Sequence, residues 1–256
     1  SEGRFRLGLG LSGPQVSEGW YGVPYVRNLT RTREYVDTVR RALGREKILM
    51  PLDGGAEGMG LGKPLKLLTR PVQDRLPIYL GAIGPRAVRQ AGAIADGWLP
   101  FLLNPAEPEV LMDGLREGAE EVGRSLADID VSPVVPVAID EDLAAARDAV
   151  RPWLAFYLGS MGAKEKNFYV DLAALHGHGD SAREVQRLAL AGDRAGSAAA
   201  VTDALVDAST IATTPSGLDA QLAAYERAGV NTLVAVPCGE DRSGVVRALA
   251  AATVTR

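Results

Sequence analysis

The stretch from Ile78 to Val88 combines residue types that suit the binding of a phosphate group. Its first half is a short apolar run, which is typical of a buried parallel strand, and Gly84-Pro85 is typical of the start of a helix. Where such a strand ends, small residues let a ligand approach the backbone. The following helix presents free N–H groups and the positive end of its dipole. The spacing therefore indicates either a phosphate site or only a tight turn, and spacing alone slightly favours the turn.

A second candidate lies between Gly8 and Pro14, at the end of the first expected strand, where α/β enzymes place their ligands. Its third glycine falls at the wrong spacing for a dinucleotide fingerprint. Beyond it, Trp20, Tyr21 and Tyr25 either line a pocket for a planar ring or pack within a loop. Glu18 is the candidate catalytic residue, because a loop carboxylate near such a ring could donate or accept a proton. A carboxylate that only faces solvent is the more frequent case.

Other chemistries find less support. His176 and His178 flank a glycine, but no carboxylate or cysteine stands at ligand spacing, so no metal site is expected. Cys238 follows an expected strand and is interpreted as a small packing residue. No serine lies in a nucleophile elbow, and a hydrolase triad is therefore not supported.

These residues depend on a series of strands and helices that alternate. The main strands are expected near residues 5, 78, 98, 132 and 233, those near 98 and 132 over 98–101 and 130–139, with a short strand near Ile211. Strands that are apolar along their length and alternate with helices indicate a parallel sheet covered on both faces. Five main strands are too few to close an eight-stranded barrel. The expected helices span about 28–43, 84–95, 107–122, 216–228 and the residues from about 243, with another starting near 141.

Two segments depart from this alternation. Residues 44–64 hold six glycines and are interpreted as one long excursion, a kind of segment that often carries function. Residues 151–208 contain only helical periods and loops, and we expect them to form a helical insertion at one end of the sheet. No linker or repeat divides the chain, so residues 1–256 are predicted to form one domain.

The composition excludes several classes of protein. With 46% hydrophobic and 23% charged residues in 256, the chain resembles an ordinary globular protein. A net charge of -4 without long runs argues against nucleic acid as a partner. No apolar stretch reaches the roughly 18 residues that span a bilayer. A single cysteine and the lack of a signal peptide lead us to expect a cytoplasmic protein that binds no membrane.

Taken together, the sequence resembles the bacterial luciferase-like flavin and deazaflavin oxidoreductases, in the branch similar to methylenetetrahydromethanopterin reductase. The resemblance spans nearly the whole chain, and its motifs are distinctive in combination. They include Gly-Arg-Phe-Arg-Leu-Gly-Leu-Gly at 3–10 and Pro-Ile-Tyr-Leu-Gly-Ala-Ile-Gly-Pro at 77–85. Further matching blocks lie at 60–67, 94–98, 167–169, 203–207 and 228–233.

The resemblance implies an (α/β)8 barrel with insertions, similar to a TIM barrel, that binds coenzyme F420 or FMN at the C-terminal mouth. Gly8 and Gly10 would border the cofactor ring. Backbone atoms at the turn would approach its phosphate-bearing tail, which raises the phosphate interpretation above the tight turn. The residues of that turn are Gly81, Ala82, Ile83, Gly84 and Pro85.

The implied reaction is hydride transfer between this cofactor and a small organic substrate, or activation of oxygen on reduced flavin. A non-catalytic protein of the same fold, with or without bound flavin, is the alternative. Members of the family carry about three further strands before the Gly-Arg-Phe-Arg stretch, so we expect about five of eight barrel strands here. Relatives commonly pair, and a homodimer is a further expectation.

Overall fold

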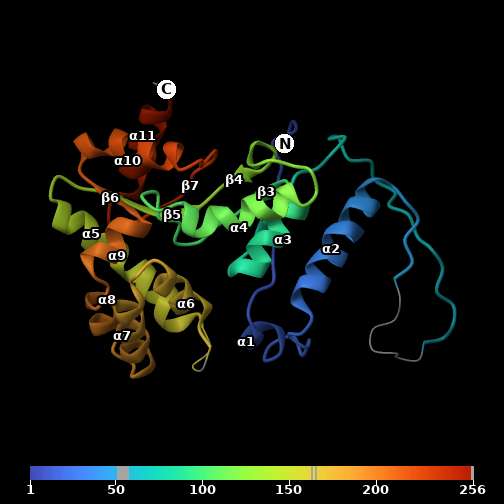
Figure 1. Cartoon of the computed structure of the whole chain (residues 1–256), viewed down its shortest axis with the longest axis horizontal. Coiled ribbons are helices and arrows are strands. Elements are labelled where there is room, and N and C mark those ends of the chain that lie inside the picture. Colours follow the sequence, from blue (N-terminus) through green and yellow to red (C-terminus); the bar gives the residue numbers. More distant parts are fainter. Residues whose placement is uncertain (51–57, 163, 165, 255–256) are drawn as a thin grey trace.

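Parallel strands form the centre of the molecule in the computed structural model, which describes residues 1–50, 58–162, 164 and 166–254 (Figure 1). One run of strands has the order β1-β2-β3-β4, and a second has the order β6-β5-β7. All the pairings are parallel. The strands are β1 (Leu7–Gly10), β2 (Ile78–Gly81), β3 (Gly97–Trp98), β4 (Asp130–Val131), β5 (Val134–Ile139), β6 (Ile211–Thr213) and β7 (Val234–Pro237).

The two runs are joined because β5 continues the line of β4. The amides of Asp130, Ser132 and Val134 donate in turn to carbonyls along β3 and its extension. On the opposite side, the carbonyl of Val131 accepts from the residues that lead into β7. Five strand positions therefore lie side by side, in the order β1, β2, β3, β4 with β5, and β7. Strands occur at or next to each expected place, but the structure has seven strands because the expected fourth strand is divided into β4 and β5 and the short strand near Ile211 is β6.

Pro136 marks the place where β5 changes its neighbour. An amide at this position would point to the same side as those of Ser132 and Val134, but proline has no N–H to donate. The last bond to the β3 side comes from Val134, and pairing with β6 starts at Val137. Pro136 thus lies between the last residue that bonds to the β3 side and the first that pairs with β6. The lack of an N–H at this position therefore costs the central strand no hydrogen bond.

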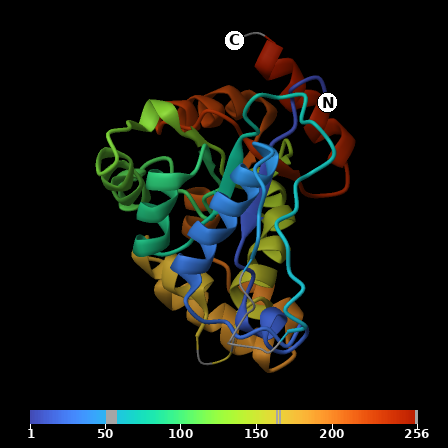
Figure 2. The same cartoon turned by 90° about the vertical axis from the view of Figure 1, so that its right-hand side faces the viewer.

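Helices follow the strands and cover one face of the sheet. Ile78, Leu80, Trp98 and Val131 pack with the helices in one large core, and a smaller core lies under the last two helices. The helices of this layer are α2 (Asn28–Leu43), α3 (Pro85–Ile94), α4 (Glu109–Glu120), α5 (Leu143–Ala155), α10 (Leu218–Arg227) and α11 (Arg242–Val254). Figures 1 and 2 show the described residues that follow 57 running beside α2 at the outside of the molecule.

The region between β5 and β6 is built from helices. After α5 come the π-helix η3 (Phe156–Ser160), α6 (Phe168–Leu175), α7 (Gly179–Leu190), α8 (Arg194–Ala199) and α9 (Asp203–Ser209). In Figure 1, α6, α7 and α8 form a group at one end of the sheet. Within the described residues, no helix is long and apolar enough to cross a membrane.

Three local expectations differ from the structure. The strand expected over 130–139 is interrupted at Ser132-Pro133, and β3 is shorter than the run 98–101. The loop after β1 contains a short helix, α1 (Pro14–Ser17), which begins with proline at its first position. The glycine-rich excursion is expected over 44–64, and residues 51–57 of it lie outside the described part. Ile48, within the excursion, forms an isolated antiparallel bridge with Leu65, just after it.

Candidate active site at the carboxyl ends of the strands

All the strands are parallel, so their carboxyl ends gather at one edge of the sheet. In Figure 1 the chain descends from the N-terminus to α1, and α1 and α6 both lie at the lower end of the view. In parallel α/β proteins the loops at the carboxyl ends of the strands form the ligand site. The residues predicted for the site, Gly8 to Gly10, Glu18 and the turn 81–85, all lie at or near this edge.

Glycines line the face of the sheet that the helices do not cover. Alternate residues of a strand point to opposite faces, and Ile78 and Leu80 point into the helix-covered core, so Tyr79 and Gly81 point the other way. Gly8 pairs with Tyr79 and Gly10 with Gly81. A Cβ at Gly10 would meet no atom within 4 Å, and one at Gly81 would meet only the Leu9 carbonyl at 3.8 Å. This face is therefore open at the carboxyl ends of β1 and β2.

A polar cluster fills the same face nearer the amino ends of the strands. The Tyr79 hydroxyl donates to Asp130 Oδ2 at 2.5 Å, and the Arg6 guanidinium lies 2.5 Å from the same oxygen. The hydroxyls of Thr232 and Ser132 donate to the Asp130 carboxylate as well. Burial raises the pKa of Tyr79, and its hydrogen bond to Asp130 raises the pKa further. The cluster joins β1, β2, β4 and the approach to β7, and so forms a floor beneath the glycine-lined face.

The turn after β2 leaves backbone amides free at the start of α3. Gly84 has φ +86°, a left-handed conformation that favours glycine, and Pro85 occupies the first helical position. In the described part of the chain the amides of Ile83 and Gly84 donate no backbone hydrogen bond. Ala82 is buried, and its carbonyl accepts from Trp98 Nε1 at 3.1 Å. Free amides at the positive end of a helix dipole form an anion site.

Glu18 closes the loop that follows α1. Its Oε1 accepts from the amide of Tyr25 at 2.8 Å, and the Tyr25 hydroxyl donates to the carbonyl of Ser12 at 3.2 Å. Ser12 has φ +58°, an uncommon value for a residue with a side chain. Tyr25 is thus fixed at the carboxyl end of β1. Trp20 and Tyr21 stack on each other instead and are largely exposed.

An aromatic cluster stands beside this loop, and sequence reasoning did not assign it to the site. It joins Phe101, after β3, to Trp153 of α5, Tyr157 of η3 and Tyr169 of α6. Ring centroids lie 5.3 Å apart for Phe101–Trp153, 4.9 Å for both Phe101–Tyr157 and Phe101–Tyr169, and 5.5 Å for Tyr157–Tyr169. The available signal was the spacing of Trp153 and Tyr157, which places two rings on one helix face.

The histidines and the cysteine show packing environments. His176 is buried, and neither ring nitrogen has a partner among the described residues. Burial lowers the pKa of His176. No group of three potential metal ligands occurs in the described part. The Cys238 thiol donates to the Val236 carbonyl at 3.4 Å, and burial raises the pKa of this thiol, which disfavours the reactive thiolate form.

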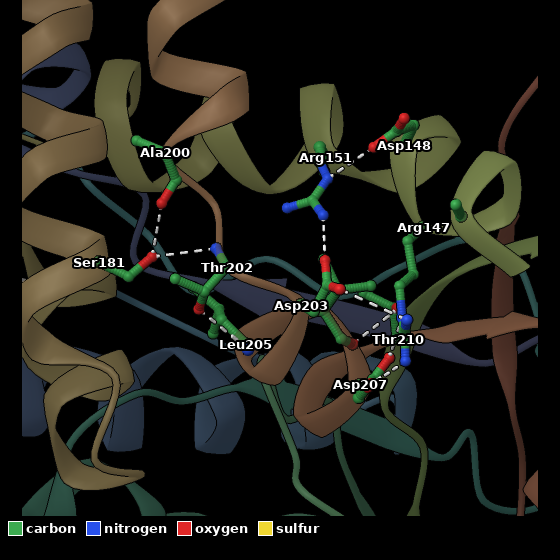
Figure 3. A network of polar contacts seen from close by, with 12 residues as sticks. Arg147, Asp148, Arg151, Ser181, Ala200, Thr202, Asp203, Leu205, Asp207 and Thr210 are labelled. Carbon is green, nitrogen blue, oxygen red and sulfur yellow. Dashed lines mark hydrogen bonds and ion pairs between the residues drawn. The ribbon is translucent and has the colours of Figure 1, made fainter.

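An ionic network holds α9 against α5 and thereby positions the helical region (Figure 3). Arg147 donates to both carboxylate oxygens of Asp207, at 2.8 and 2.7 Å. Arg151 pairs with Asp203 and with Asp148. Nearby, the Ser181 hydroxyl donates to the Ala200 carbonyl at 2.9 Å. Because α5 carries Trp153, this network helps to fix the aromatic cluster.

The parallel sheet, the open glycine-lined face and the helix N-terminus beside it define a barrel-like α/β enzyme whose site suits a planar ligand with an anionic tail. The sequence profile of the luciferase-like monooxygenase family matches residues 1–232. The chain belongs to this family, and the predicted family and TIM-barrel-like fold are both confirmed.

Relatives of known name support the same assignment. A protein of Mycobacterium tuberculosis, provisionally named a coenzyme F420-dependent oxidoreductase, is 41% identical over 245 residues, which are 91% of this chain and 70% of the relative. The 5,10-methylenetetrahydromethanopterin reductase of Methanolobus tindarius is 31% identical over 96% of this chain and 72% of its own.

Solved structures share the fold. The coenzyme F420-dependent tetrahydromethanopterin reductase of Methanopyrus kandleri superposes with a TM-score of 0.76 at 24% identity, over 95% of this chain and 72% of its own. An F420-dependent secondary alcohol dehydrogenase in complex with an F420–acetone adduct gives a TM-score of 0.70 at 19% identity, over 96% of this chain and 70% of its own.

Proposed function

We propose that this chain is a coenzyme F420-dependent oxidoreductase that transfers hydride between F420 and a small organic substrate. The observation that carries the proposal is the open glycine-lined face beside the free amides that precede α3. The names of the relatives from Mycobacterium tuberculosis and Methanolobus tindarius supply the chemistry, and they favour an enzyme over a non-catalytic binding protein. The same composition that argued against nucleic acid and membranes leads us to propose a cytoplasmic enzyme.

The residues of the mouth fit such a cofactor. The absent Cβ atoms at Gly10 and Gly81 leave room for a planar ring against the sheet, and Gly8 borders the same face one pair lower. The amides of Ile83 and Gly84, with Pro85 setting the start of α3, would hold the phosphate of the tail. Gly81 would approach the ligand with its backbone. The cofactor would supply the carbon that accepts or gives the hydride.

Other residues of the chain would orient the ligands. The floor formed by Tyr79 and Asp130 limits how deep a ring can enter. Glu18 is proposed as the group that holds or accepts a proton at the mouth, beside its hydrogen bond to Tyr25. Glu18→Gln keeps the acceptor for that amide and removes the charge. We expect it to lower turnover without loss of cofactor binding; unchanged turnover would remove Glu18 from the mechanism.

Cofactor titration tests the proposal directly. F420 fluorescence should change on binding to the whole chain, with FMN titrated in parallel. Gly81→Val places two methyl groups on the open face, where the fold has room for them, and we expect at least a tenfold weaker F420 affinity. This loss corresponds to about 1.4 kcal/mol.

The matched control is Gly62→Val. Gly62 is exposed, and its Cβ would make only an ordinary contact with Leu49, at 3.5 Å. We expect no change in F420 affinity. Tighter binding of FMN than of F420 would replace F420 by FMN in the proposal. The absence of binding by both, or an equal loss in the Gly62 variant, would contradict the proposed site.

A further inference from the structure

Three tyrosines from distant parts of the chain gather at the carboxyl end of β1. Tyr25 is fixed there by its bond to the Ser12 carbonyl, and the rings of Tyr157 and Tyr169 are in edge contact. Burial raises the pKa of Tyr169, and the phenols of Tyr157 and Tyr25 raise it further. The side-chain amide of Gln15, in α1, donates to the Met161 carbonyl at 2.8 Å and ties the loop after β1 to the end of η3. The group bridges the loop after β1 and the helical region.

The two tyrosines of the helical region are held in place by Asn167. Its side-chain amide donates to the Leu158 carbonyl of η3 at 2.6 Å, and its oxygen accepts from the amide of Tyr169 at 3.0 Å. Asn167 is buried, so the bonds are shielded from water. One side chain thereby sets η3, which carries Tyr157, against the start of α6. A π-helix turn is frequent at functional sites.

The hydroxyls of Tyr157 and Tyr169 differ from that of Tyr25 in having no bond of their own. Among the described residues neither hydroxyl has a hydrogen-bond partner, and both side chains are only half-buried. A phenol hydroxyl can donate one hydrogen bond. Two such donors therefore stand at the mouth beside the rings of Phe101 and Trp153.

We propose that Tyr157 and Tyr169 bind the substrate by donating hydrogen bonds to an uncharged oxygen, while Phe101 and Trp153 contact an apolar, flat part of the same molecule. This substrate class rests on the proposed function, in that the cofactor would occupy the neighbouring glycine-lined face. Among the described residues, no lysine or arginine side chain makes a hydrogen bond to Tyr157 or Tyr169, and the polar groups that the cluster itself offers are the two hydroxyls. We therefore take a neutral carbonyl or alcohol compound as the substrate class of this proposal.

Binding measurements without cofactor test the proposal. The probes are acetophenone, a flat ring with a neutral carbonyl, and ethylbenzene, which has the same shape without the oxygen. Saturation-transfer NMR gives the affinity of each for the whole chain. Tyr157→Phe and Tyr169→Phe keep the ring contacts and remove one hydroxyl each. We expect each variant to bind acetophenone about five to ten times more weakly, as for the loss of one hydrogen bond, and ethylbenzene unchanged.

Two further variants separate the hydroxyl contribution from the ring contribution. Tyr35→Phe removes an exposed hydroxyl on α2 and should change neither affinity. Trp153→Leu should weaken both probes, because it removes ring area without touching the donors. A circular dichroism melt confirms that each variant folds. The proposal is overturned if acetophenone does not bind the parent protein. It is also overturned if the phenylalanine variants bind acetophenone with the same affinity as the parent. If the parent protein does not bind F420, but the phenylalanine variants still bind acetophenone more weakly than the parent, the proposed cofactor is contradicted and the substrate proposal stands.

Discussion

Asp96 shows how one carboxylate can tie separate segments of this chain together. It accepts hydrogen bonds from Arg40 of α2 at 3.1 Å, from Arg75 at 2.5 Å and from the amide of Ile78 at 3.0 Å. Its burial alone would raise the pKa of Asp96, but the three hydrogen bonds outweigh burial and lower it. The ionised form is therefore favoured by folding.

Asp96→Asn should lower the free energy of unfolding by about 2 kcal/mol at pH 7, since charged hydrogen bonds are lost at a half-buried site. The folded pKa is depressed, so the stabilisation is present above the unfolded pKa of about 3.9 and is lost as pH falls through the folded pKa. Urea unfolding at pH 7 and pH 3.5 should show the difference between parent and variant shrinking with acid. Asp113→Asn, at an exposed pair with Arg116, should change little at either pH; a difference independent of pH would refute the linkage.

The site was only partly predictable at this scale. Gly84-Pro85 after an apolar run signals a helix start that any reader of the sequence can recognise. That Gly10 and Gly81 share one face depends on the pairing register of β1 with β2, which joins residues 71 positions apart. The contact of Phe101 with Tyr169 depends on where a helical region docks. Local patterns carry no information about either.

At the scale of elements, two glycines let α3 and α4 approach closely, and the free amides of the site lie directly before the first residue of α3. A Cβ at Gly118 would collide with the Arg89 carbonyl, and one at Gly92 with the Leu115 carbonyl. Both obstacles are backbone atoms, which cannot move away as a flexible side chain could. The helix pair therefore requires glycine at both positions.

Gly118→Ala should destabilise the protein by about 1–3 kcal/mol, as expected for overpacking, although alanine is the better helix former. The same change at Gly114, also on α4, makes only ordinary contacts, at 3.8 Å from the Pro85 carbonyl. There we expect stabilisation by up to about 1 kcal/mol. Thermal unfolding of both variants measures the contrast. If both substitutions shift stability in the same direction, the close approach of the helices is not what determines the effect.

The bounds of a helix or strand agree with the prediction where the local sequence signals all indicate the same element. The helix expected over 28–43 has these bounds, because its apolar period and the glycine after it agree. The strand expected over 130–139 is broken at Pro133, where the chain passes from β4 to β5. The π-helix could not be predicted, since a widened turn is set by the packing of η3 on α7 rather than by residue preference.

At the scale of the whole molecule, the helical region is fastened to the rest by contacts between α5 and α9. Arg147 makes a bidentate pair with Asp207, and its side chain is 23% exposed. Arg151, 16% exposed, reaches Asp203 on the preceding turn of α9. These pairs lie where the chain is about to return to the sheet through β6.

Arg147→Gln should lower the melting temperature by about 2–4 °C, because a partly exposed bidentate pair contributes about 1 kcal/mol. Hydrogen exchange of the amides in α9 should increase, while exchange in β1 and β2 stays unchanged. Arg187→Gln, at an exposed pair within α7, should leave both measurements unaltered. A uniform increase of exchange across the molecule would show that the network stabilises the fold as a whole rather than this region.

The change of neighbours at Pro136 has a consequence for how such proteins can diversify. The chain leaves the sheet at the end of β5 and returns at β6, beside the same strand that it left. The helical region between them begins and ends beside β5. Its length and sequence can therefore vary while the pairing of β1, β2, β3, β4 and β7 is preserved. Tyr157 and Tyr169 both lie in this helical region. Exchange of the helical region between related proteins would then offer evolution, and the protein engineer, a means of changing the ligand while the sheet is kept.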